Sequence, residues 1–380
     1  MGVYMKKLTL IGLMLSLIAC SDKDGIKPSE LTDISRKGEV NVKWTKKLDK
    51  AEKAYGYRLI PAFTKGQLFV ATQSGSVMAL DANTGVQNWQ SNLDVEISAG
   101  PGISDTVLAV ATPEGGVVVM DLDTGSTLWQ AQVTSEVLSP PVIDRNKVIV
   151  RTQDGRVYGF DIQSGKRDWV FDTNIPNLTL RGNSTPIARG GRLYVGFDNG
   201  KVAALDIEDG SVTWIQDVVK SQGKTEIDRI ADIDGDIDVV ATDLYIASAA
   251  DKTMSVATES GRVLWSQDLG SVTGVTVSRR SLYLSDNESV VHQLNRADGT
   301  QGWTQDSLKN RELTKPSFYL GDLLVGDFEG YIHVLEGDSG EVVSRLRAGD
   351  SGYYHSPLVI GDMAYSYNLD GTLTAFSFQE

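Results

Sequence analysis

Short hydrophobic runs alternate with turn sequences along most of the chain, and they recur in groups of four. One group contains the runs 99–103, 107–111, 116–122 and 126–132. Ser-Asp, Pro-Glu-Gly and Asp-Thr-Gly turns separate these runs. Runs of this length that alternate in polarity or are rich in β-branched residues predict strands joined by tight turns. We therefore predict that each group forms one four-stranded antiparallel sheet.

The last two runs of each group meet at a turn whose sequence repeats. Its pattern is Ala-x-Asp-x-x-Thr-Gly-x-x-x-Trp, with Asp81, Gly85 and Trp89 in the first unit. The aspartate, glycine and tryptophan return at Asp121, Gly125, Trp129, Asp161, Gly165, Trp169, Asp206, Gly210 and Trp214. The pattern then weakens to glycine and tryptophan at Gly261, Trp265, Gly299 and Trp303, and to glycine alone at Gly340, where Ser344 takes the tryptophan position.

The spacing of the prolines shows the same period independently. Five prolines each lie 24 residues before the glycine of their unit, at positions 61, 101, 141, 186 and 316. Pro357 would place an eighth glycine one residue past the end of the sequence, so the eighth unit lacks its last run. The sequence 42–45 around Trp44 matches that missing run and has no unit before it.

Four strands in every ~40–45 residues are typical of one blade of a β-propeller. We therefore predict an all-β, eight-bladed β-propeller over residues 40–380, with four antiparallel strands per blade. The N-terminal strand around Trp44 would complete the last blade and leave no free edge in the ring. In the repeated turn, aspartate would accept backbone hydrogen bonds, glycine would adopt a positive φ, and tryptophan would pack between blades.

Residues 1–19 predict a lipoprotein signal peptide. Two lysines precede the apolar run 8–17, which is too short to span a bilayer. The run ends in Leu-Ile-Ala-Cys, which resembles a bacterial lipobox and predicts lipidation of Cys20; the alternative is an ordinary signal peptide that ends in cysteine. Ser21 then favours sorting to the outer membrane. The polar stretch 20–39 is expected to be a lipidated tether.

Composition excludes several classes of function. The 380 residues include 50 acidic and 36 basic side chains, a net charge of −14, which disfavours binding to nucleic acid. The single cysteine excludes an intrachain disulfide and a cysteine-based zinc site. The sequence contains no Ser-His-Asp order, phosphate-binding loop or dinucleotide-binding fingerprint.

The repeat resembles that of enzymes that use pyrroloquinoline quinone (PQQ). With the lipobox, the eight units and the segments 177–182 and 225–234, the chain resembles the BamB family. The second segment lies in the longest gap between repeats, 51 residues from Gly210 to Gly261. BamB proteins are non-enzymatic lipoproteins of the outer-membrane β-barrel assembly machinery (the BAM complex). They bind the periplasmic POTRA domains of BamA, the subunit that inserts barrels.

The resemblance implies a lipid-anchored scaffold at the outer membrane that faces the periplasm and assists the folding and insertion of β-barrel proteins. The implied partners are the BamA POTRA domains, other BAM subunits and nascent outer-membrane proteins, and no cofactor is implied. In BamB proteins, two loops on one face are implicated in holding BamA. Their residues match Leu178, Leu180, Arg181, Asp232 and Asp234 here.

The sequence supplies its own reasons for these five residues. Leu178 and Leu180 are alternate residues, so both would point the same way in an extended segment; the alternative is that both are buried between blades. Asp232 and Asp234 lie in the longest insertion, and insertions in repeat proteins often form loops on the binding face. We expect the two aspartates to act through electrostatics at the rim of an interface.

The main alternative is a propeller that binds a quinone or another small molecule in its central funnel. PQQ dehydrogenases generally use bound calcium, a catalytic aspartate and, in many cases, adjacent cysteines, which this chain does not have. We therefore predict no catalytic residue.

Two other patterns could suggest metal sites. The run 232–238 has aspartate at alternating positions and resembles a calcium loop. However, its sixth residue is Ile237 and its twelfth is Asp243 rather than glutamate, so an acidic loop before a strand is the preferred interpretation. His292 and His333 occupy equivalent positions in neighbouring units, which favours ordinary strand residues. We therefore predict no metal ligand.

Overall fold

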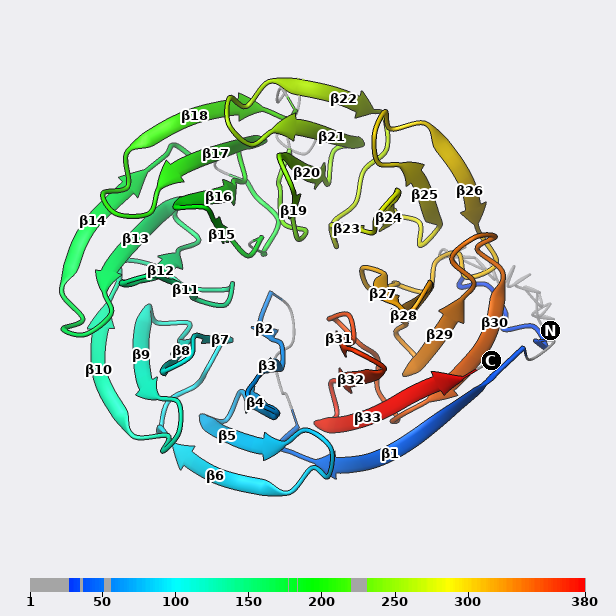
Figure 1. Ribbon diagram of the computed structural model, residues 1–380, viewed down its shortest axis with the longest axis horizontal. Helices are drawn as coiled ribbons and strands as arrows, with labels where there is room; N and C mark the ends of the chain where they lie inside the picture. The colour runs from blue at the N-terminus through cyan, green and yellow to red at the C-terminus, as the bar shows by residue number, and fades with distance from the viewer. Residues whose placement is uncertain are drawn as a thin grey trace, which may run out of the picture.

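The computed structural model describes residues 27–34, 37–50, 56–176, 178–182, 184–219 and 231–379. Over these residues the chain is all-β and forms an eight-bladed propeller (Figure 1), which confirms the predicted architecture. None of these described segments contains a helix long and apolar enough to cross a membrane.

Blades 1 to 4 follow one another along the chain, each with its inner strand first. Blade 1 contains β3 (Ala62–Thr64), β4 (Gln67–Ala71), β5 (Ser76–Asp81) and β6 (Gln87–Asn92). Blade 2 contains β7 (Ala99–Ile103), β8 (Val107–Ala111), β9 (Gly116–Asp121) and β10 (Thr127–Gln132). Blade 3 contains β11 (Val142–Asp144), β12 (Lys147–Arg151), β13 (Arg156–Asp161) and β14 (Arg167–Asp172). Blade 4 contains β15 (Ile187–Arg189), β16 (Arg192–Gly196), β17 (Lys201–Asp206) and β18 (Val212–Asp217).

Blades 5 to 7 continue the same order. Blade 5 contains β19 (Asp238–Val240), β20 (Asp243–Ser248), β21 (Lys252–Ala257) and β22 (Val263–Gln267). Blade 6 contains β23 (Val275–Val277), β24 (Ser281–Ser285), β25 (Val291–Asn295) and β26 (Gln301–Gln305). Blade 7 contains β27 (Ser317–Tyr319), β28 (Asp322–Gly326), β29 (Tyr331–Leu335) and β30 (Val342–Arg347).

Blade 8 joins the two ends of the chain. It contains β31 (Leu358–Ile360), β32 (Met363–Tyr367), β33 (Thr372–Gln379) and, as its outer strand, β1 (Glu39–Lys47). β1 pairs antiparallel with β33 from Glu39 opposite Gln379 to Lys47 opposite Thr372. The ring is therefore closed by the strand that contains Trp44, as the repeat predicts. One departure is β2 (Arg58–Leu59), which adds a short parallel strand to the inner edge of blade 2.

The repeated turn joins each blade to the one before it. Asp81 Oδ1 accepts hydrogen bonds from the backbone N–H of Thr84 at 2.9 Å and from its hydroxyl at 2.7 Å. Gly85 has a φ of 69°, and a Cβ there would lie 2.8 Å from the ring of Trp44. The Trp44 Nε1 donates to the carbonyl of Ala82 at 3.0 Å. The tryptophan of blade 8 therefore packs on the repeated turn of blade 1.

This contact recurs at every tryptophan. The other six indoles donate at 2.8–3.1 Å to the carbonyls of Leu122, Ile162, Ile207, Thr258, Arg296 and Gly337. Each indole packs on the turn of the following blade. Ser344 takes the tryptophan position in blade 7, which is followed by blade 8. The last two strands of blade 8 come from opposite ends of the chain, so no turn joins them and none can receive an indole. The absence of tryptophan at position 344 thus has a structural cause.

Because neighbouring strands of a blade are antiparallel, the successive connections between them lie alternately on the two faces of the ring. The connection from each outer strand to the next inner strand lies on one face, together with the turn between the second and third strands. We call this side the funnel face. Residues 27–34, expected within the tether, instead lie against blades 6 and 7.

Candidate functional site

A cavity of about 580 Å³ opens at the centre of the funnel face. Residues from six connections between blades line it, including Arg58, Leu180, Asp234, Lys315 and His355. These connections carry the chain from an outer strand inward to the axis, so they bring distant parts of the sequence together. The cavity is the place where the predicted loop residues meet side chains from blades 5 to 8.

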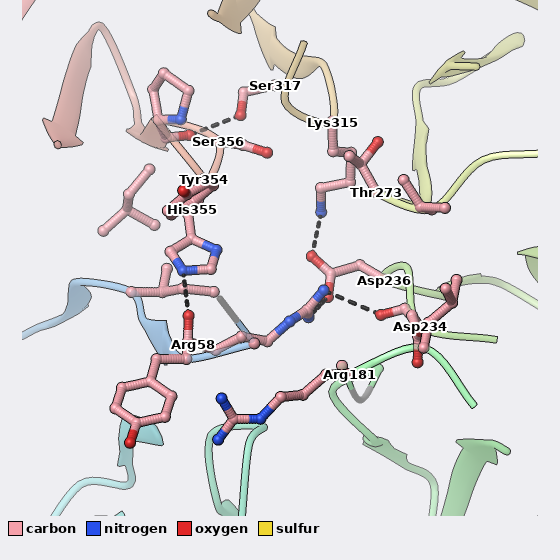
Figure 2. Close-up of a pocket in the computed structure, with 18 residues that line it drawn as sticks. Arg58, Arg181, Asp234, Asp236, Thr273, Lys315, Ser317, Tyr354, His355 and Ser356 are labelled. Atoms are coloured by element: carbon pink, nitrogen blue, oxygen red, sulfur yellow. Dashed lines mark hydrogen bonds and ion pairs between the residues drawn. The ribbon is translucent and has the colours of Figure 1, made fainter. Parts of the chain in front are cut away.

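Charged side chains meet on one wall of the cavity. The Arg58 guanidinium pairs with the Asp236 carboxylate and donates to Thr185 Oγ1 at 3.1 Å. Lys315 Nζ approaches the same carboxylate at 2.9 Å (Figure 2). Burial alone would raise the pKa of Asp236, but the charges of Arg58 and Lys315 outweigh it and hold this pKa well below the usual range. Asp236 is therefore ionised and links the two cations.

His355 lies on the opposite wall as a neutral side chain. Its Nε2 donates to the carbonyl of Tyr57 at 2.9 Å. Burial, and then the charge of Arg58, lowers the pKa of His355 to about 4. At neutral pH this imidazole carries no charge, and its partner is a backbone carbonyl rather than a carboxylate.

The two loops predicted to bind a partner do come together beside this cavity. The Asp232 carboxylate accepts a hydrogen bond from the backbone N–H of Leu180. Asp234 packs against Gly182, where an added Cβ would lie 3.2 Å from the Asp234 Cγ. The segment 178–182 therefore rests on the end of the long insertion that precedes β19.

The orientation of the two aspartates corrects the expectation that they lie at an exposed rim. Asp232 is 0% exposed and Asp234 is 7% exposed. Burial raises the pKa of Asp232 to about 7 and that of Asp234 to about 8. The end of the insertion turns toward the interior to reach β19. Its two aspartates therefore contact the buried side of segment 178–182.

The exposed part of the surface comes from segment 178–182. Leu178 lies at a bend and is 42% exposed, so the two leucines are not both buried between blades. Leu180 is half-buried and lines the cavity. Because the chain bends here, the alternation expected of an extended segment does not apply. Arg181 is exposed, forms an ion pair with Glu136 at 2.9 Å and lies 5.5 Å from the centre of the Tyr57 ring. We call Leu178, Leu180 and Arg181 the contact loop.

A buried ion pair lies beneath the contact loop. The side chains of Arg151 and Asp198 pair with each other, and both are 0% exposed. The Arg151 guanidinium also lies 5.5 Å from the centre of the Phe197 ring. Burial raises the pKa of Asp198 in spite of Arg151. The pair lies close enough to Asp232 and Asp234 to affect the pKa of both: Asp198 raises it and Arg151 lowers it.

The remaining metal hypotheses can be placed in the structure. Three carboxylates of the run 232–238 have protein partners: Asp232 accepts from the Leu180 N–H, Asp236 pairs with two cations, and Asp238 Oδ2 accepts from the Val277 N–H at 3.1 Å. His292 and His333 occupy equivalent places in β25 and β29, and each contacts the aspartate of the preceding turn, at 2.8 and 3.0 Å. Within the part of the chain that the structure describes, no group of three or more histidine, cysteine, aspartate or glutamate side chains is arranged to hold a metal.

Some predicted residues lie outside the described residues, and some residues of the cavity were not predicted. Cys20, Asn177 and the segment 225–230 belong to the first group. Arg58 and Lys315 belong to the second. Lys315 directly precedes Pro316, so charged neighbours of the repeated prolines are a signal that could have found it. Arg58 lies outside the repeat and offers no comparable signal.

Comparison with known proteins identifies close relatives. A family model described as "Outer membrane protein assembly factor BamB" matches residues 73–305 and 287–380. A protein of that name from Pseudomonas aeruginosa is 38% identical over 99% of this chain and all of its own length. Another, from Kangiella koreensis, is 38% identical over 94% of this chain and 92% of its own.

Solved structures agree with these matches. The crystal structure of BamB from Moraxella catarrhalis superposes with a TM-score of 0.82 at 29% identity, over 89% of this chain and all of that one. The quinohemoprotein alcohol dehydrogenase of Comamonas testosteroni superposes with a TM-score of 0.67 at 11% identity, over 89% of this chain and 76% of that one. The second likeness shows a shared fold alone.

Proposed function

The chain belongs to the family of outer membrane protein assembly factors BamB, and we propose that it binds the periplasmic POTRA domains of BamA. In this role it is a non-enzymatic scaffold of the BAM complex that assists the folding and insertion of β-barrel proteins. Its Cys20 carries the lipid that holds it at the outer membrane, and the propeller faces the periplasm.

The observation that carries this proposal is the contact loop. It presents an exposed leucine, Leu178, beside an exposed guanidinium, that of Arg181. Interfaces commonly have a small apolar centre with a polar rim, and arginine is enriched among the residues that contribute most to binding. The pairing of Arg181 with Glu136 and Tyr57 limits the side-chain entropy that binding would cost.

The support beneath the loop gives Asp232 a separate role. Its carboxylate holds the Leu180 N–H, so it fixes the path of the loop without reaching the surface. We propose that Asp232 and Asp234 act by positioning the loop, while Leu178 and Arg181 touch the partner. Leu180, half-buried at the edge of the cavity, contributes to both.

A quinone-binding propeller gains no specific support from the site. The likeness to a quinohemoprotein alcohol dehydrogenase and to a europium-containing methanol dehydrogenase is at 11–12% identity and shows the fold alone. The single cysteine lies at position 20, in the lipobox, so it has no neighbour with which to form the adjacent pair of many PQQ enzymes.

The test is to measure binding of the BamA periplasmic domains to loop variants, by calorimetry with the purified proteins. Leu178→Ala, Leu180→Ala and Arg181→Ala should each weaken binding by about 1 kcal/mol or more, the usual threshold for a contributing residue.

Two controls match the size and exposure of the altered side chains. Leu128 is 51% exposed on β10, and Arg167 is exposed on β14. Leu128→Ala and Arg167→Ala should leave binding unchanged. Equal losses in the loop and control variants, or a large fall in melting temperature with the loop variants, would remove the contact loop from the proposal.

A further inference from the structure

The segment 27–34 crosses the outside of the ring between blades 6 and 7, where Figure 1 shows the N-terminal chain in blue beside β26 and β30. At its start, the Ser29 N–H donates to the carbonyl of Lys309 at 2.9 Å. The Asn310 side chain donates to the carbonyl of Lys27 at 3.2 Å. Leu31 packs against the apolar cluster that includes Leu308. We call residues 27–34 the strap.

Two guanidiniums hold the strap, and interior groups hold both of them. Arg311 donates to the carbonyl of Ser29 at 3.0 Å and forms an ion pair with buried Asp327 at 2.8 Å. Arg345 donates to the carbonyl of Thr32 at 3.4 Å, while its Nε donates to buried His333 at 3.0 Å. Because these arginines are fixed from within, the strap binds to a preorganised surface.

The direction of the strap fixes where the chain leaves the propeller. Its first residues contact 309–311, in the connection from β26 to β27, which lies on the funnel face. Further along, Lys37 pairs with Glu336 and Glu341 at the β29–β30 turn, which lies on the opposite face. The N-terminal side of the strap therefore starts from the funnel face, at the rim of blades 6 and 7.

Cys20 is seven residues before Lys27. A chain of seven residues spans at most about 25 Å, even when it is fully extended. If the strap were released, the attachment point would move to Gly38 on the opposite face and the reach would grow to about 60 Å. Docking of the strap thus changes both the length of the link to the lipid and the face from which it departs.

We propose that the strap determines which side of the propeller meets the lipid surface: the rim of the funnel face at blades 6 and 7 is held next to the membrane, and blade 2 is held away from it. This inference rests on the proposed lipidation of Cys20, but not on the proposed binding of BamA. It places the contact loop, between blades 3 and 4, on the face from which the anchor departs.

The test uses fluorescence energy transfer from the propeller to a membrane. The full-length lipoprotein is reconstituted into phosphatidylethanolamine–phosphatidylglycerol vesicles that contain a rhodamine lipid as acceptor. Because Cys20 is the one native cysteine and its thiol is blocked by the lipid, a donor dye can be attached to one introduced cysteine. Glu288→Cys and Glu114→Cys place the dye at the same position of the turn between the second and third strands, where both residues are exposed. They lie in blades 6 and 2, which face each other across a ring of eight. Because Glu288 pairs with Lys309 at 2.6 Å, the single variant Glu288→Gln, unlabelled, serves as the control that losing this pair leaves the strap docked.

We expect transfer from position 288 to be about twofold higher than from position 114. Leu31→Asp places a charge in the apolar cluster under the strap and should make the two values equal, whereas Leu31→Met should preserve the difference. Circular dichroism and melting establish that the variants are folded, and replacing Arg345 with Ala provides a second way to release the strap.

Equal or reversed transfer from the two positions, in a protein whose mass shows the acyl chains, would overturn this inference and leave the proposed function intact. A Cys20 without acyl chains would overturn both the anchoring and this inference, while binding of BamA would still be measured separately. An orientation that survives both strap variants would also overturn the role given to the strap.

Discussion

A pair of glycine substitutions tests whether the tryptophan contacts hold the ring together. Gly125 and Gly66 both have positive φ, 70° and 76°. A Cβ at Gly125 would lie 2.5 Å from the Trp89 ring, whereas a Cβ at Gly66 would meet nothing within 4 Å. The two alanine variants therefore share the backbone penalty and differ in the clash with the indole.

The magnitudes follow from these contacts. The left-handed conformation costs a residue with a Cβ about 1–2 kcal/mol, so Gly66→Ala should lose that much of the free energy of unfolding. In Gly125→Ala the indole must also move. Overpacking adds about 1–3 kcal/mol, and loss of the hydrogen bond from Trp89 Nε1 to the Leu122 carbonyl, 3.1 Å long, adds about 1 kcal/mol. We expect a total loss of about 3–6 kcal/mol.

The assay is urea unfolding followed by circular dichroism. The decisive comparison repeats both substitutions in a Trp89→Ala background, where most of the extra cost of Gly125→Ala over Gly66→Ala should disappear because the clash with the indole is gone. Only the Ser91 hydroxyl, 2.9 Å from the added Cβ, would still have to rotate away. The idea that each repeated turn packs against an indole would be refuted by either of two results. One is an equal loss of free energy of unfolding for the two variants in the wild-type background; the other is an unchanged difference between them without Trp89.

Three further predictions concern the buried aspartates and the closure. Burial raises the pKa of Asp234 to about 8, against about 3.9 in an unfolded chain, so between these pH values the folded state holds a proton that the unfolded state has lost. This proton's contribution to the free energy of unfolding is lost as pH rises from about 4 to about 8, so the melting temperature should fall over that range and change less in Asp234→Asn. A pH profile that Asp234→Asn leaves unchanged would contradict this. Asp232→Ala should weaken BamA binding by the same factor at low and high salt, because the residue positions Leu180 and does not face the partner. A loss of binding that becomes smaller at high salt would instead show that Asp232 acts electrostatically at the rim of the interface. Removing residues 21–34 should leave the propeller folded in a melting experiment, whereas removal through Lys47 should lower the melting temperature strongly, and equal melting of the two truncations would exclude β1 as the closing strand.

The repeat made the fold predictable because each of its residues has one local task. Gly125 must adopt a positive φ and leave room for Trp89, and no other residue type meets both demands. The spacing of such residues then fixes the number of blades, and Trp44 fixes the closing strand. Even the loss of tryptophan at Ser344 follows the architecture, since blade 8 offers no turn to receive it.

The site was less predictable because its contacts are long-range and lie outside the repeat. The resemblance to BamB proteins placed segments 178–182 and 232–234 on one face, but it did not predict the hydrogen bond from the Leu180 N–H to the buried Asp232 carboxylate. Nothing in the period marks Arg58, whose partner Asp236 is 178 residues away. The polar composition of 27–34 suggested a tether. Its docking on the propeller could not be predicted, because most of its hydrogen bonds are accepted by backbone carbonyls, which every sequence has.

The contact loop is proposed to hold the BamA periplasmic domains. The most direct measurement is co-purification of BamA with the intact lipoprotein from detergent-solubilised membranes, comparing the wild type with a Leu178→Ala, Arg181→Ala double variant that melts at the wild-type temperature. We predict that BamA is retained by the wild type and largely lost by the variant. Retention of BamA by the folded double variant, or its absence from the wild type, would contradict the account.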